Sequence, residues 1–359
     1  NAILVISAPA FRMAAALNGV EPYALNKGPN PVGTVIFQAN ILNGGEHADN
    51  KVDVQETMIS VIANPNATGP NAVRTEKEAI EVGAQLFQRL KAKLKKLGLN
   101  TNVGDEGGFA PNVLQNSEYL RIAAETIKES PWGSLYGTQI GFSMDPAFSE
   151  RSFNEGGQIF YWLEGETDEA GQARRIKLSS GTEIGVIRDE VHERPGQKVL
   201  VLTSKELTQY WQDLIAQYPI ISIEDGYDQN DMKGYESFTT FANQASKAGA
   251  TEQQNLKFNI QREFGIDVVG DDLLVTNLRQ LKAAVNGETI QFAGKMLAFP
   301  PNTVNAILVK INQVGSISES KEVIRWALEH GISVKISHRS GETEDSIIAD
   351  IAKWATTLT

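Results

Sequence analysis

The strongest constraint on the fold is a regular alternation of short β-rich segments with longer segments of helical period. Segments with apolar residues every three or four positions predict helices, and the short apolar runs between them predict strands. Repeated βα units of this kind build a parallel sheet. About eight strands are predicted, the number that closes a TIM-type α/β barrel. The predicted strands are residues 35–42, 52–62, 102–106, 139–145, 219–225, 266–271, 304–310 and 332–338.

Predicted helices occupy much of the remaining sequence, and two insertions interrupt the alternation. Residues 150–202 are polar and rich in glycine with short β-like runs, which predicts a hairpin excursion, and residues 287–302 form the second insertion. Insertions in surface loops cost a large barrel little stability. The predicted helices are residues 1–25, 74–97, 117–129, 204–217, 232–247, 278–285, 318–330 and 344–358.

Composition excludes several classes of protein. The chain of 359 residues carries a formal net charge of -11, which argues against a nucleic-acid or anionic-membrane surface. It holds no cysteine, so disulfides, a thiolate nucleophile and a cysteine-based zinc site are excluded. No membrane span is predicted, because the apolar opening, residues 2–17, is too short to cross a bilayer. The absence of cysteine fits a reducing compartment, and we expect a cytoplasmic location.

Nearly every predicted strand from residue 102 onward ends in an ionisable side chain. In a barrel the carboxyl ends of the strands face one mouth, where active sites lie. Any single acid there has an alternative interpretation, because aspartate commonly caps the helix that follows. The set as a whole predicts one polar site. Its members are Glu106, Asp145, Glu224, Asp271, Lys310 and His338.

Three of these residues predict a metal site. Asp145, Glu224 and Asp271 end three predicted strands, with neither histidine nor cysteine among them. Carboxylate oxygens alone are hard ligands that suit Mg²⁺. Asp225 and Asp272 follow two of these residues, and we interpret them as supporting or structural acids.

Two further features predict acid–base chemistry. Lys310 ends an apolar strand, where it is either a general base or a lysine whose head reaches water. Burial and a nearby Mg²⁺ would both disfavour its ammonium form. Glu106 and Glu56 predict a carboxyl pair, and two close carboxyls raise the pKa of one of them enough to make a general acid. Such a pair would also suit glycoside hydrolysis, but that chemistry leaves the three other acids and the lysine without a role.

The segment Ser337-His-Arg-Ser-Gly-Glu-Thr-Glu-Asp345 predicts an anion-binding loop. Arg339 offers a planar fork for phosphate or carboxylate. His338 and His47 are two of the four histidines in the chain, and we interpret the other two as surface residues.

Several segments closely resemble signatures of the enolase family. The resemblance runs over nearly the whole chain apart from the two insertions, and the segments occur in the family's order. They are residues 102–112, 269–273 with 275–277, 310–316 and 337–345.

The resemblance implies a glycolytic lyase that reversibly dehydrates 2-phosphoglycerate to phosphoenolpyruvate with two Mg²⁺ per active site. It implies that Lys310 is the base and that Glu106, paired with Glu56, is the acid that helps hydroxide leave. It also implies that His338 joins the catalytic residues. Asp145, Glu224 and Asp271 are implied as ligands of the tighter metal. The implied substrate-binding residues are His47, Arg339, Ser340 and Gln55.

The resemblance also implies the domain organisation and the assembly. Residues 1–30 correspond to the tail of a small N-terminal α+β capping domain, and residues 31–359 correspond to the barrel domain. The family's loop serine and its C-terminal substrate lysine lie outside this sequence. We expect further sequence at both ends, because the chain opens inside one predicted helix and stops just after another. A homodimer or a higher homo-oligomer is expected.

Some residues depart from the family pattern and keep a second interpretation open. Glu46 and Asp49 add acids to the loop around His47, Gly226 replaces a proline, and Pro146 follows Asp145. Acids there would oppose an anionic substrate. The alternative is an enolase-like paralogue with little or no turnover that serves as a binding or structural subunit through its insertions. Another acid dehydratase of the enolase superfamily is a third possibility.

Overall fold

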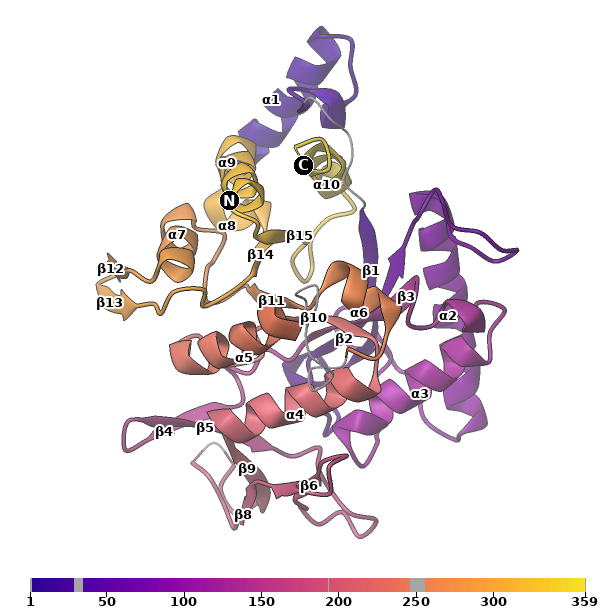
Figure 1. The fold of residues 1–359 in the computed structure, drawn as a ribbon, viewed down its shortest axis with the longest axis vertical. Coiled ribbons are helices and arrows are strands. Elements are labelled where there is room, and N and C mark those ends of the chain that lie inside the picture. Colours follow the sequence, from indigo (N-terminus) through magenta and orange to yellow (C-terminus); the bar gives the residue numbers. More distant parts are fainter. Residues whose placement is uncertain (1, 29–34, 193, 246–255, 359) are drawn as a thin grey trace. The chain divides into compact units, whose positions relative to one another are not determined.

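The computed structural model describes residues 2–28, 35–192, 194–245 and 256–358 (Figure 1). The chain divides into two compact units. The first unit contains Asn1–Val35 and Asp267–Thr359, and the second contains Ile36–Ile266. In the part of the chain that the structure describes, none of the helices is both long enough and apolar enough to span a membrane.

The second unit is built on four neighbouring strands. They are β1 (Ile36–Asn43), β2 (Glu56–Ile62), β3 (Ile140–Asp145) and β10 (Ile220–Glu224), which pair in that order. The helices of this unit are α2 (Glu76–Lys96), α3 (Asn116–Lys128), α4 (Ser204–Gln217), α5 (Met232–Ala245) and α6 (Asn259–Phe264). These ranges follow the predicted elements closely, except that α6 was not predicted.

Local sequence explains where two of these helices begin. Thr75 caps α2 by accepting a hydrogen bond from the Glu78 amide, and the Glu78 carboxylate accepts one from the Thr75 amide. Thr203 and Glu206 form the same reciprocal cap at the start of α4. Each capping box satisfies two amides that the first helical turn leaves without a partner. The apolar side of α2 is then buried at helical spacing, as its sequence period predicts.

The prediction of a wholly parallel sheet is wrong for the first strands. β2 runs antiparallel to both β1 and β3, whereas β10 runs parallel to β3. The reason is the connection between β1 and β2, which is a loop with no crossover helix, so the chain turns back along the strand that it has just left. As a result, Glu56 at the start of β2 pairs with Asn43 at the end of β1 and with Asp145 at the end of β3.

The predicted strand at residues 102–106 is also not formed. Val103 makes only an isolated bridge with Phe109, and the chain between them turns tightly. The Gly107 amide donates to the Gly104 carbonyl over 3.0 Å, and Gly107 has a φ of 79° that favours glycine. This segment is therefore a loop that presents Glu106 rather than a strand that ends in it.

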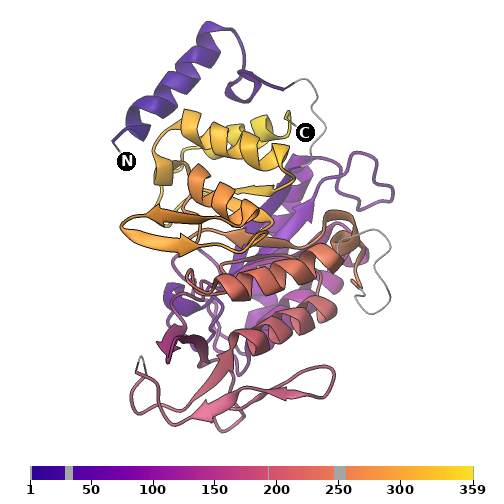
Figure 2. The ribbon, with the colours of Figure 1, turned by 60° about the vertical axis from the view of Figure 1, so that its left-hand side comes forward.

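Residues 150–202 form an antiparallel excursion, drawn as the pink strands and loops at the lower end of Figure 2. Its main sheet has the order β4 (Ser152–Glu155), β5 (Gln158–Leu163), β9 (Val199–Thr203) and β8 (Val186–Arg188). A short pair, β6 (Ile176–Lys177) and β7 (Glu183–Ile184), lies within the same segment. Trp162 packs with Val191, Val199 and Val201, so this excursion has an apolar cluster of its own.

The first unit contains three parallel strands, β11 (Asp267–Gly270), β14 (Ala306–Val309) and β15 (Ser333–Ile336). Its helices are α1 (Leu4–Leu17), α7 (Leu278–Asn286), α8 (Ile311–Val314), α9 (Ile317–Glu329) and α10 (Ile347–Ala355). The second predicted insertion is a hairpin of β12 (Thr289–Phe292) and β13 (Lys295–Ala298).

The buried side-chain amide of Gln261 binds three backbone carbonyls of the second unit, and its replacement tests what these hydrogen bonds contribute to stability. The Gln261 side chain is fully buried, and its Nε2 donates over 3.0 Å to each of the carbonyls of Ile215, Tyr218 and Ile220. Gln261→Met keeps the length of the side chain but leaves these carbonyls without that donor. We expect the free energy of unfolding to fall by about 1–3 kcal/mol. Gln85→Met, at an exposed position of α2, should change it far less, and equal losses in urea unfolding would contradict this interpretation.

Candidate active site

The second unit brings together three predicted site residues, His47, Glu56 and Glu106. One side-chain ligand atom from each lies within 4.8 Å of the others. His47 Nδ1 is 3.4 Å from Glu56 Oε1, within the distance of an ion pair. Glu56 is buried, and Glu106 and His47 are half-buried. The structure therefore places the predicted carboxyl pair in one cluster with the histidine of the preceding loop.

Burial and charge set the protonation of this cluster. Burial raises the pKa of Glu56, and the carboxylates of Glu106 and Glu224 raise it further, while His47 opposes the rise. The interaction with Glu56 raises the pKa of His47 above its ordinary value, against the effect of burial. An imidazole with a raised pKa beside crowded carboxyls is a group that can share or move a proton, which is what general acid chemistry requires.

Asn43 explains why two loops meet at this cluster. Its side-chain Nδ2 donates to the Gln55 carbonyl over 3.1 Å, and its Oδ1 accepts from the Gly108 amide over 2.9 Å. The Asp105 amide also donates to the His47 carbonyl over 3.0 Å. The loop from residue 44 to residue 55 is thereby joined to the loop that carries Glu106.

A glycine permits this close approach. A Cβ atom at Gly104 would lie 2.4 Å from the His47 carbonyl oxygen, which is too close for any other residue without backbone movement. Asp105 is exposed, and its amide rather than its carboxylate serves the loop contact. Glycine at position 104 therefore has a structural reason that the sequence alone did not identify.

Two of the predicted metal ligands end adjacent parallel strands. Ile223 of β10 pairs with Met144 of β3. The next residues along the two strands, Glu224 and Asp145, therefore lie at the same edge of the sheet. Glu224 is 3% exposed. Asp145 also accepts a hydrogen bond from the Ala147 amide over 3.1 Å. Two neighbouring carboxylates without a thiolate or imidazole between them are a donor set that fits Mg²⁺.

The third predicted ligand, Asp271, lies in the first unit together with the predicted base. The Lys310 ammonium forms an ion pair with Asp271 Oδ2, and Gln313 Nε2 donates to Asp271 Oδ1 over 2.7 Å. The Lys310 amide donates to Thr276 Oγ1 over 3.0 Å, and Thr276 also hydrogen-bonds Gln313. The lysine side chain is 16% exposed, so it is a largely buried cation held against a carboxylate. That Asp271 completes the metal site remains a prediction.

Sequence reasoning gave no role to two residues of this group. Thr276 lies in residues 275–277, which resemble an enolase-family signature, but the sequence does not predict its contacts with Lys310 and Gln313. Val275 and Thr276 have φ angles of 43° and 54°, which β-branched residues rarely adopt. Gln313 follows the lysine by three residues and lies within α8. Only the backbone geometry shows that the strained residues Val275 and Thr276 lie beside the ion pair of Lys310 with Asp271.

The remaining predicted residues lie on exposed or half-buried loops. His338, Arg339 and Ser340 are exposed in the loop after β15, where the Arg339 amide donates to the Glu342 carboxylate over 2.8 Å. Gln55 is half-buried just before β2.

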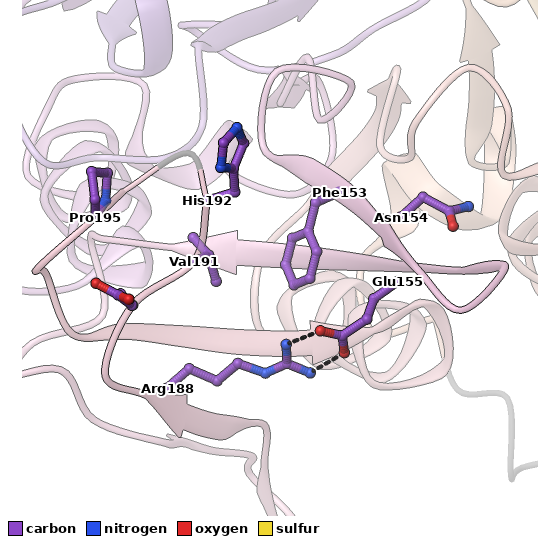
Figure 3. A pocket seen from close by; sticks show the side chains of 8 residues that line it. Phe153, Asn154, Glu155, Arg188, Val191, His192 and Pro195 are labelled. Atoms are coloured by element: carbon purple, nitrogen blue, oxygen red, sulfur yellow. Dashed lines mark hydrogen bonds and ion pairs between the residues drawn. The ribbon is translucent and has the colours of Figure 1, made fainter.

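A separate cavity of about 590 Å³ lies on the insertion (Figure 3). Its lining includes Phe153 and His192 and an ion pair between Arg188 and Glu155, with an Nη2–Oε2 distance of 3.1 Å. None of its lining residues is a predicted site residue. The chemistry of the strand ends, rather than the size of this surface hollow, identifies the candidate active site.

The fold and the strand-end groups define an α/β protein with an acidic site where strands meet loops. A family model described as "Enolase, C-terminal TIM barrel domain" matches residues 32–184 and 188–357. The chain therefore belongs to the enolase superfamily. The match confirms the predicted TIM-type α/β barrel fold.

The contact between His47 and Glu56 gives a direct test of the cluster. We expect Glu56→Gln to lower the pKa of His47 toward its ordinary value, because the interaction with Glu56 is the largest cause of the rise. An NMR titration of the histidine ring in metal-free buffer measures this change, with Glu46→Gln as the control in the same loop. A His47 pKa that moves equally in both variants would contradict the described contact.

Proposed function

We propose that this protein is a Mg²⁺-dependent lyase that reversibly dehydrates 2-phosphoglycerate to phosphoenolpyruvate, a step of glycolysis and gluconeogenesis. The observation that carries the proposal is the cluster of buried Glu56 with half-buried Glu106 and His47 in the second unit. Within the first unit, Lys310 is held on Asp271, which supports its assignment as the base. Membership of the enolase superfamily supports the same reaction class.

In this proposal Lys310 accepts the proton from the carbon beside the substrate carboxylate once its ammonium has lost a proton, a loss that burial and Mg²⁺ held by Asp271 would favour. The reaction builds a second negative charge on that carboxylate, and Mg²⁺, when bound, stabilises this charge. Lys310 is positioned for the task by three contacts: its ammonium to Asp271, its amide to Thr276, and Thr276 to Gln313. A lysine fixed in this way loses little freedom when it meets the substrate.

Glu106 then supplies the proton that lets the hydroxyl leave as water. Burial and neighbouring carboxylates raise the pKa of Glu56, which favours the protonated form of one carboxyl in the Glu56–Glu106 pair. His47 lies against Glu56 and reaches the pair from the loop after β1. We propose that His47, Gln55, Arg339 and Ser340 bind the substrate, and that His338 lines the site.

Asp145, Glu224 and Asp271 are the proposed ligands of the tighter of two Mg²⁺ ions. Asp145 and Glu224 fit because they end adjacent strands and offer only oxygen atoms. We further propose a homodimer or a higher homo-oligomer in the cytoplasm.

The two proton transfers can be separated experimentally. We expect Lys310→Ala to abolish the exchange of the substrate's C2 proton with deuterium in the solvent. Glu106→Gln should retain this exchange yet lose dehydration by at least about 100-fold, since the acid acts after the base. NMR follows the exchange, and ultraviolet absorbance follows the enol product.

Lys295→Ala, on the β12–β13 hairpin, is the control for loss of a lysine, and it should leave both steps unchanged. Retained exchange in Lys310→Ala would remove this lysine from the proposal. A folded, Mg²⁺-loaded parent protein without turnover would exclude the enzyme and favour a binding paralogue.

The metal ligands make a second test. We expect Asp145→Asn and Glu224→Gln each to weaken Mg²⁺ binding about 10-fold or more, because each removes a charged oxygen ligand. Isothermal titration calorimetry measures the change. Asp168→Asn, at an exposed turn of the insertion, should leave the affinity unaltered. Unchanged affinity in both ligand variants would exclude this pair from the metal site.

A further inference from the structure

Asp53 is a fully buried carboxylate in the loop that carries His47. Its Oδ1 accepts a hydrogen bond from the Glu164 amide over 2.8 Å, and its Oδ2 accepts one from the Gly165 amide over 2.9 Å. Both amides belong to the insertion, just after β5. One side chain of the site loop therefore holds the backbone of a segment that is 111 residues away in sequence.

Asn116, at the start of α3, completes the coordination of Asp53. Its Nδ2 donates to Asp53 Oδ2 over 2.7 Å, and its Oδ1 accepts from the Asp53 amide over 2.9 Å. This reciprocal pair fixes both the side chain and the backbone of Asp53. The loop, the insertion and α3 thus meet at a single residue.

A buried guanidinium balances the charge of Asp53. Arg151 Nη1 is 3.5 Å from Asp53 Oδ1 and 3.3 Å from Glu164 Oε2, and the arginine is 3% exposed. The Arg151 guanidinium also lies 4.3 Å from the centre of the Trp162 ring. Burial raises the pKa of Asp53, while Arg151 and the N–H donors oppose that rise. A carboxylate with a cation and several donors is a stable buried anion.

Glu166, a neighbouring buried acid of the insertion, favours the protonated form. Burial, followed by the charge of Asp53, raises the pKa of Glu166 to about 8. Glu166 is therefore protonated at neutral pH and does not repel Asp53. Its Oε1 is 3.3 Å from the Asn116 amide and 3.4 Å from the Tyr210 hydroxyl, so it too is tied to the surrounding elements.

Short backbone bonds connect Asp53 to the candidate catalytic groups. The Gly45 amide donates to the Val52 carbonyl over 2.7 Å, and the Gly44 amide donates to the Gln55 carbonyl over 3.0 Å. These bonds close the loop between β1 and β2 on itself. Asp53 lies between them in sequence, three residues before Glu56. A displacement of Asp53 would therefore move His47 and the start of β2 together.

We propose that Asp53 is a positioning residue that anchors the His47 loop to the insertion, so that the insertion forms part of the support of the active site. The part of this proposal that concerns turnover rests on the proposed function. The part that concerns loop anchoring does not, because it can be measured without any substrate.

Asp53→Asn tests the anchor, because it keeps the shape of the side chain and replaces one accepting oxygen with a donor that faces other donors. We expect amide hydrogen exchange in residues 44–52 and 164–167 to accelerate about tenfold or more. Mass spectrometry of the free protein measures this exchange, and a thermal melt shows that the variant is folded.

Asp231→Asn is the matched control. Asp231 is also a buried acid of the second unit, and it accepts hydrogen bonds from the hydroxyls of Tyr161 and Ser204 and from the Gly234 amide. It has no contact with the His47 loop among the described hydrogen bonds. We expect Asp231→Asn to lower thermal stability without accelerating exchange in residues 44–52. The same acceleration in both variants would overturn the proposal.

The double variant Asp53→Ala with Arg151→Met separates anchoring from charge balance. It removes the acid and its counter-ion together, and Glu164, which also contacts Arg151, keeps its ion pair with Arg194. If Asp53 anchors the loop through the Glu164 and Gly165 amides, exchange stays fast in the double variant. Recovery of parent-like protection would mean that Asp53 serves only to neutralise Arg151, and would overturn the proposal.

Asn116→Ala decides the matter if Asp53→Asn does not fold. It removes the reciprocal pair that fixes the side chain and the backbone of Asp53, so the contacts of Asp53 with the Glu164 and Gly165 amides lose their support. Faster exchange confined to residues 44–55 and 164–167 supports the anchor, and unchanged exchange there overturns it.

Turnover of 2-phosphoglycerate supplies the final measurement. We expect kcat/KM to fall by about 100-fold in Asp53→Asn and to be unchanged in Asp231→Asn, because misplacing a catalytic loop by about 1 Å has an effect of that size. Fast loop exchange with unchanged kcat/KM would overturn the positioning role. A parent protein without turnover would contradict the proposed function, while the exchange results would still decide the anchor.

Discussion

The antiparallel pairing of β2 with β3 determines where the acids of the second unit meet. Because β2 runs back along β3, its first residue, Glu56, lies beside the last residue of β3, Asp145. A parallel β2 would have put Glu56 at the opposite edge of the sheet, one strand length from Asp145. The loop between β1 and β2 makes this reversal possible, and the same loop carries His47. One choice of strand direction thus brings acid, histidine and metal-ligand candidates to one edge.

Local signals made most of the elements predictable. Helical periodicity and capping pairs such as Thr75 with Glu78 act over a few residues, so the ranges of α2 and α4 follow directly from sequence. Apolar β-rich runs likewise identified β3, β10, β14 and β15 to within a few residues. The family match confirms the barrel to which these elements belong. What periodicity does not encode is strand direction, which depends on how the connecting segment folds.

The missed features share a dependence on contacts between distant segments. Residues 102–106 have the composition of a strand end, but the hydrogen bond from the Gly108 amide to Asn43 Oδ1 holds them as a loop. The role of Thr276 needs the positions of Lys310 and Gln313, which come from a later strand and helix. The sequence pattern predicts Asp53 only as part of the strand at residues 52–62. The partners that bury Asp53 and donate hydrogen bonds to it are more than 60 residues away in sequence, so no local pattern predicts them.

Carboxylates in this chain have different chemical consequences according to the donors around them. Asp53 is encircled by amides and a guanidinium, which satisfy its oxygens and leave it no capacity for a ligand. Glu56 is buried beside other carboxyls, which raise its pKa, and the neighbouring His47 opposes that rise. Satisfied hydrogen bonds make a buried acid rigid, whereas crowding by like charges makes it reactive. A hydrogen-bonded acid such as Asp53 can therefore hold in place the loop that leads to a reactive acid such as Glu56.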